Sequence, residues 1–299
     1  MKATQAGARI ALKNILFLTD FSEPSEVALP YAIAVAREYE ATLHALHVLI
    51  PQPYTYTTME LGNLAMEAQE EAAEDAMRRV NAQMTGLAHQ SIVVPGVGVW
   101  PSAEQAITQC SADLIVLGTH GRTGAQKILM GSAAEEIFRR SPVPVMTIGP
   151  AVRAGVHSAA HFRRVLFATD FSEESKAALP YAISFAQENQ AELMLLHVIP
   201  ERKDQATLTS QSISVAEAMH RLHELVPAEA ELWCRPEPMA KCGKPTSAIL
   251  DAAEEFGADL IVLGIRKAAG VPGAATHLEI SVAHNVVAHA KCPVLTVRG

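Results

Sequence analysis

Four residues between positions 118 and 132 have the types and the spacing of a phosphate-binding loop. Gly118 and Gly121 follow a short apolar run, and after nine intervening residues Gly131 and Ser132 open a predicted helix. Glycine lets the backbone approach a ligand closely and take a positive φ angle without strain. A Gly-Ser pair at a helix start presents unpaired N–H groups, a hydroxyl and the positive end of the helix dipole. The segment therefore predicts a site for phosphate groups.

The residues around this loop extend the candidate site. Leu117 ends the preceding strand and Ala133 continues the helix, so their backbone borders the loop. His120, Arg122 and Lys127 would add positive charge or hydrogen-bond donors. The alternative is that the glycines only make a turn and Ser132 only caps a helix. The full spacing G-x2-G-x9-G-S favours the phosphate site over that alternative.

The elements that would position this loop occur twice in the chain. The segment Asn14–Glu23 recurs as Arg164–Glu173, an offset of 150 residues, and Ala112–Gly118 recurs as Ala258–Gly264. Further matches in the same order include Leu46-His-Val with Leu196-His-Val, and Val143–Ile148 with Cys292–Val297. Chance does not produce several matches in one order, so the chain is a duplication.

Each half alternates short apolar strands with helical segments, which predicts an α/β fold. Strands that are apolar along their whole length indicate a parallel sheet covered on both faces. We expect two tandem doubly wound, Rossmann-like domains, each with a mostly parallel five-stranded sheet. The domains are expected at residues 13–149 and 163–299, with a linker at 150–162. Ligands of such sheets bind at the carboxyl ends of the strands, so the residues after each strand are the candidates.

Local signals place several boundaries in these domains. Ser22 and Ser172 are predicted N-caps of the first helix in each half. The third strand of the second half is expected near Glu231–Cys234. Trp100 and Pro101 interrupt a Gly-x-Pro turn that the second half keeps, which predicts a shortened third helix in the first half.

Both halves resemble the universal stress protein family. The motif G-x2-G-x9-G-(S/T) of its ATP-binding members is matched here by Gly118, Gly121, Gly131 and Ser132. The resemblance implies ATP as the ligand, with Asp20 and Val48 near the adenine and ribose. It also implies a role in stress response.

The resemblance further implies dimerisation through the last strand of each domain. Those strands are Val143–Ile148 and Val294–Val297. They would pair with each other within one chain, as a pseudo-dimer, or across two chains as a homodimer. The sequence leaves both arrangements open.

The second half departs from the loop pattern. Lys267 stands where the second glycine belongs, Ile280 replaces the third, and the loop from Gly264 to Ser281 is three residues longer. A β-branched residue does not readily take a positive φ angle, and its side chain would occupy phosphate space. We therefore expect the second domain to bind ATP poorly or not at all, with Ser281 as an ordinary helix residue.

Composition and charge limit the other functions. A net charge of −8 with scattered lysines and arginines argues against nucleic-acid or anionic-membrane binding. No apolar run approaches a membrane span, and four cysteines without CxxC pairing fit a reduced, cytoplasmic protein. His47 and His197 lie in strand patterns and are expected to be core histidines rather than ligands. The histidine pairs on predicted helices lack the carboxylate or cysteine partners of a metal site.

Three functions remain open. The leading hypothesis is a regulatory protein that binds ATP in the first domain, with or without Mg²⁺. A slow ATPase is the second, but no Walker-type GK[ST] is present, and Asp20 is the one acid near the loop. Efficient turnover is therefore not expected. The third is a nucleotide-free scaffold in which both crevices are vestigial.

Overall fold

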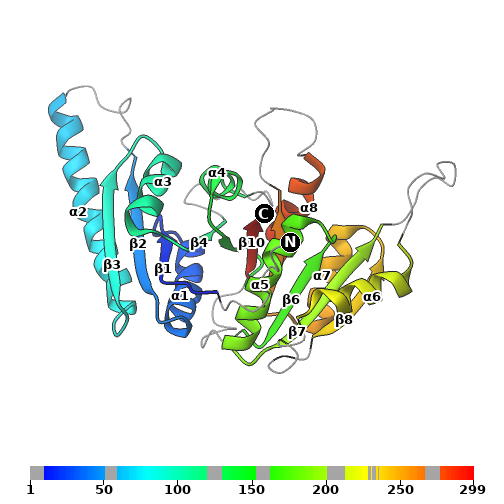
Figure 1. Ribbon diagram of the computed structural model, residues 1–299. Coiled ribbons are helices and arrows are strands. Elements are labelled where there is room, and N and C mark those ends of the chain that lie inside the picture. Colours follow the sequence, from blue (N-terminus) through cyan, green and yellow to red (C-terminus); the bar gives the residue numbers. More distant parts are fainter. Residues whose placement is uncertain are drawn as a thin grey trace. The chain divides into compact units, whose positions relative to one another are not determined.

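The chain folds into two compact α/β units that repeat one another (Figure 1). The computed structural model describes residues 10–50, 59–119, 130–152, 162–200, 213–227, 230, 234, 236–266 and 277–299. One unit spans Leu12–Val145, and the other consists mainly of Met146–Gly299.

In the first unit, helices and strands alternate along the chain. The elements are β1 (Asn14–Leu18), α1 (Glu23–Glu38), β2 (Thr42–Leu49), α2 (Met59–Gln83), β3 (His89–Pro95), α3 (Val99–Cys110), β4 (Leu114–Gly118) and α4 (Ser132–Arg140). The strands pair in parallel in the order β3-β2-β1-β4. The chain first moves outward from β1 to β3 and then returns past β1 to β4. Right-handed crossovers therefore place α1 and α2 on one face and α3 and α4 on the other.

The second unit repeats this order with two additional strands, β5 and β10. Its elements are β5 (Val145–Ile148), β6 (Arg164–Thr169), α5 (Glu173–Glu188), β7 (Glu192–Ile199), α6 (Val215–Leu225), β8 (Glu237–Cys242), α7 (Pro245–Phe256), β9 (Leu260–Ile265), α8 (His277–His289) and β10 (Val294–Arg298). The strand order is β5-β10-β9-β6-β7-β8. Strand β5 lies beside β10, where the Thr147 Oγ1 hydroxyl donates to the Val294 carbonyl at 3.1 Å. The two last strands thus pair within one chain in this structure.

The cores follow from the apolar strands. Phe17 of β1 and Phe138 of α4 are fully buried in the first half, and Phe167 and Phe185 are fully buried in the second. Burying the carbon surface of such side chains stabilises each unit by roughly 1.5–3 kcal/mol per large residue. No helix in the described part of the chain combines the length and hydropathy that a membrane span requires.

The predicted starts of the first helices are confirmed. Ser22 is the N-cap of α1 and Ser172 the N-cap of α5. In the second unit, the Ser172 Oγ accepts a hydrogen bond from the Ser175 N–H at 3.2 Å, as an N-cap hydroxyl should. Pro30 and Pro180 lie inside these helices and do not mark their starts.

Two predictions about the third strand and third helix are wrong. The strand expected near Glu231–Cys234 lies instead at Glu237–Cys242, and Pro238 in it hid the strand pattern. β8 is the edge strand of its sheet, which is where a sheet tolerates proline. Helix α3 is also not shortened, since it has 12 residues, as α7 does. It begins two residues before Pro101, which therefore sits in the first turn, where a missing N–H costs nothing.

Candidate functional site

The predicted nucleotide contacts of the first unit gather at the carboxyl edge of its sheet. Strand β1 pairs with β2 and with β4, so that Leu18 lies opposite both Leu46 and Leu117. Asp20, Val48 and Gly118 therefore sit at the ends of three adjacent strands. The chain changes direction in the sheet between β1 and β4, which makes this edge a topological switch point.

A tight turn after β1 holds Asp20. The Asp20 Oδ1 accepts hydrogen bonds from the Ser22 N–H at 3.0 Å and from the Ser22 hydroxyl at 2.5 Å. The next residue, Phe21, has a φ angle of 60°, in the left-handed region. Its N–H donates to the Thr19 hydroxyl at 3.0 Å. The turn thus links the end of β1 to the start of α1 through side-chain hydrogen bonds.

His47 is a buried structural histidine, as expected. Its Nδ1 donates to the Thr19 carbonyl at 2.8 Å, which fixes the proton on that nitrogen. Its ring stacks on Phe21 with centroids 4.3 Å apart. Val48, the next residue, is half-buried and lies opposite Val94 of β3.

Gly118 has a packing role that the sequence analysis did not foresee. A Cβ atom there would lie 2.6 Å from the Pro24 carbonyl oxygen, so a glycine is needed for α1 to approach β4. Gly118 is not among the glycines with a positive φ angle, which corrects that part of the expectation. Gly264 has the same role, since a Cβ there would lie 2.5 Å from the Glu174 carbonyl carbon. This close approach explains why both copies keep the glycine.

The start of α4 is organised as an N-cap. Gly131 is the N-cap residue, with φ −61° and ψ 151°, and Ser132 begins the helix. The Gly131 N–H donates to the Thr119 carbonyl at 2.6 Å, which ties the helix start to the end of β4. The N–H groups of the first turn, which includes Ala133, have no partners within the helix, as at every helix start.

His120, Gly121, Arg122 and Lys127 lie outside the described residues. Leu117 is 5% exposed, so only its backbone could face a ligand. Of the predicted contact residues, the structure thus brings together Asp20, Val48 and Gly118 at the strand ends. It also links Gly131, at the start of α4, to the same edge of the sheet through Thr119.

Gly96, which follows β3, was not among the predicted site residues. A Cβ atom at this position would overlap the Ser102 Oγ atom and lie 2.8 Å from the Val48 Cγ1 atom, so the glycine leaves room for both side chains. The available signal was a glycine directly after a strand, the same signal that identified Gly118. Its position beside Val48 makes it a fourth strand-end residue of the candidate site.

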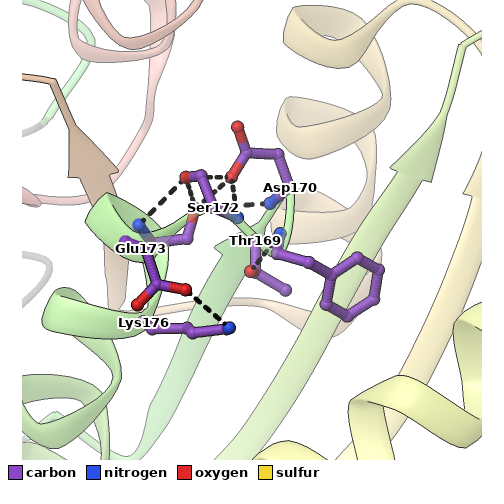
Figure 2. A network of polar contacts seen from close by, with 7 residues as sticks. Thr169, Asp170, Ser172, Glu173 and Lys176 are labelled. Carbon is purple, nitrogen blue, oxygen red and sulfur yellow. Dashed lines mark hydrogen bonds and ion pairs between the residues drawn. The ribbon is translucent and has the colours of Figure 1, made fainter.

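In the second unit the corresponding turn holds Asp170 through several side-chain hydrogen bonds (Figure 2). The Asp170 Oδ1 accepts from the Ser172 N–H at 2.9 Å, from the Ser172 hydroxyl at 2.5 Å and from the Ser175 hydroxyl. Burial would raise the pKa of Asp170, but these hydrogen bonds hold it below its ordinary value. In the first unit, the Ser25 hydroxyl instead donates to the Ser22 carbonyl at 2.8 Å. The Ser25 hydroxyl also accepts a hydrogen bond from the Thr19 hydroxyl at 3.1 Å.

The second unit also lacks the helix start that the first unit presents. Helix α8 begins at His277, so Ile280 and Ser281 already lie inside it. This confirms the prediction that Ser281 is an ordinary helix residue. Within an α-helix, the N–H of Ser281 bonds to the carbonyl four residues earlier, so it is not available to an anion. The helix start has moved away from the position matched to Gly131.

Fold and site together define a duplicated doubly wound α/β protein with candidate binding residues at the strand ends of each unit. The sequence profile of the universal stress protein family matches residues 11–149 and again residues 161–298. The chain therefore belongs to the universal stress protein family.

Individual relatives match one half or the whole chain. A universal stress protein of Bacillus subtilis is 33% identical over 154 residues, covering 46% of this chain and 99% of the relative. One of Mycolicibacterium smegmatis is 26% identical over 300 residues, covering 95% and 97% of the two chains. The crystal structure of a universal stress protein from Archaeoglobus fulgidus shares the fold, with a TM-score of 0.70, 24% identity and coverage of 95% and 96%. The last two relatives thus align with this chain over nearly its whole length.

Proposed function

We propose that this protein binds ATP in its first domain and acts as a regulatory protein of the stress response. The observation that carries the proposal is the convergence of Asp20, Val48 and Gly118 at the switch point of the sheet, with Gly131 tied to the same edge. The first-turn N–H groups of α4 supply donors and a positive dipole end for phosphate. Asp20 supplies a carboxylate for a ribose hydroxyl. Mg²⁺ would neutralise phosphate charge there.

The difference between the two copies supports binding in the first domain alone. Helix α4 starts at Ser132, directly after the third motif glycine, whereas α8 starts at His277 and runs through the corresponding position. In the second copy the donors of the helix start are displaced along the chain. We therefore propose a stoichiometry of one nucleotide per chain.

A nucleotide-free scaffold is the second candidate, and two observations favour it. Gly118 is required by the packing of α1 whether or not a ligand binds. The Gly131 N–H already donates to the Thr119 carbonyl. Two of the four motif residues thus have structural roles that need no nucleotide, so the motif alone does not separate the two functions.

Nucleotide released from the freshly purified protein separates them. The protein is denatured and the released nucleotide identified and counted, for the natural chain, for Gly131→Val and for Ile280→Val. Gly131 has an extended backbone that valine also adopts, so Gly131→Val should fold and place a side chain directly before the first turn of α4. Ile280→Val is the matched control in the degenerate copy.

We expect ATP from the natural chain and from Ile280→Val, and none from Gly131→Val. Added ATP at about 100 times Kd should then stabilise the first two proteins by about 2.7 kcal/mol. Release of ADP would shift the proposal toward slow hydrolysis. If no protein releases nucleotide and ATP raises no melting temperature, the scaffold function is correct.

A further inference from the structure

His47 contacts both neighbours of Asp20 in the chain. Its Nδ1 donates to the Thr19 carbonyl, and its ring lies 4.3 Å from that of Phe21 with an interplanar angle of 31°. His47 is 7% exposed, and successive side chains of a strand point to opposite faces, so it points away from the side on which Val48 lies. It is therefore placed to act on a ligand only through other residues.

The turn that carries Asp20 needs such support. A φ angle of 60° is unfavourable for a bulky residue such as Phe21 and persists only where surrounding contacts hold it. The contacts seen here are the hydrogen bond from the Phe21 N–H to the Thr19 hydroxyl and the stacking on His47. The direction of the Asp20 side chain depends on this turn, because its own backbone lies between the two residues that His47 holds.

The second unit contains the same arrangement. The His197 Nδ1 donates to the Thr169 carbonyl at 2.8 Å, and its ring lies 4.4 Å from that of Phe171 at 31°. Phe171 has a φ angle of 64°. The arrangement thus belongs to the fold of both units, while only the first unit keeps the loop motif. His197 therefore provides an internal control for any structural cost of changing His47.

We propose that His47 is a positioning residue for the nucleotide: it holds the Thr19–Phe21 turn so that Asp20 faces the ligand. This inference rests on the proposed ATP binding by the first domain. A buried histidine of β2 would then contribute to ATP affinity without touching the ligand.

Four variants of the full chain separate the two contacts of the imidazole. His47→Phe keeps a ring but removes the donor to Thr19, whereas His47→Asn keeps a donor near the Nδ1 position but removes the ring. His197→Phe and His197→Asn make the same changes in the second unit. ATP affinity is measured by isothermal titration calorimetry, and unfolding of the unliganded proteins by urea titration.

Both His47 variants should bind ATP about tenfold more weakly, because a displaced contact loses most of its binding contribution. Both His197 variants should bind ATP within about twofold of the natural chain, although the same contacts are lost. Loss of stability should be similar at the two positions. If His47→Phe does not fold, the ATP affinity of His47→Asn alone tests the inference.

Two results would overturn the inference. One is ATP affinity unchanged in both His47 variants, and the other is an equal loss of affinity in the His197 variants. If the natural chain binds no ATP, the proposed function fails, and crystal structures of unliganded His47→Phe and the natural chain decide the inference. Phe21 leaving the left-handed region in the variant supports it, and Phe21 retaining that conformation overturns it.

Discussion

The glycines at the ends of β4 and β9 are explained by packing before any ligand is considered. At Gly118 the missing Cβ leaves room for the backbone of Pro24, and at Gly264 for that of Glu174. Neither contact involves a flexible side chain that could move aside. These positions therefore fix how closely the first helix of each unit approaches its sheet.

Gly118→Ala should destabilise the unliganded protein by about 2 kcal/mol, because a Cβ would force α1 away from β4. Urea unfolding without nucleotide measures this cost. Gly98→Ala is the control: it adds a Cβ whose nearest neighbour, Pro101 Cδ, is 3.5 Å away, and should cost less than about 1 kcal/mol as a weaker N-cap. Equal stabilities for the two variants would contradict the packing role.

The helix after β4 and the helix after β9 begin at different positions relative to the loop motif. We expect this difference to affect ATP binding more than any single substitution does. Helix α4 has nine residues from Ser132, whereas α8 has 13 residues from His277. Ile280 lies in the first turns of α8 rather than before it. A glycine at that position would therefore sit inside a helix, where it lowers stability and exposes no N–H group to a ligand.

We accordingly expect Ile280→Gly to bind no second ATP and to lose about 0.5–1 kcal/mol of stability. Replacing residues 265–281 with Thr119–Ser132 should instead create a second site, because it restores both the spacing and the helix start. Calorimetric titration counts the sites in each protein. A second ATP bound by Ile280→Gly alone would show that the identity of the residue, and not the start of the helix, decides binding.

The strands and helices show where sequence patterns suffice and where they fail. The Ser22 and Ser172 N-caps were predictable, because serine is preferred at this position, although only the Ser172 hydroxyl makes the cap hydrogen bond. Strand β8 was not, since Glu237–Cys242 carries Pro238 and a lysine, and its sheet neighbour β7 supplies the pairing that the local sequence does not signal. The hydrogen bond from His47 to Thr19 joins residues 28 positions apart, so only the fold reveals it.

Two compact units, of which one carries the proposed nucleotide site, should respond unequally to ATP. The strand-end residues of the proposed site all belong to the unit Leu12–Val145. A ligand that binds one native unit raises the unfolding temperature of that unit and leaves the other unchanged, because the linkage acts only through the state that binds. Differential scanning calorimetry should therefore resolve two transitions, of which ATP raises one.

Matched glycine variants assign the transitions. Gly118→Ala should lower the transition that ATP raises, and Gly264→Ala should lower the other, since each adds a Cβ against the first helix of its own unit. At about 100 times Kd, ATP should raise the first transition by about 10 °C, from a stabilisation of about 2.7 kcal/mol. If ATP instead raised the temperature of the transition that Gly264→Ala lowers, the nucleotide site would lie in the second unit, contrary to the proposal. A single transition that both variants lower would instead mean that the duplicated chain unfolds as one cooperative body, with nucleotide binding in one half stabilising the whole.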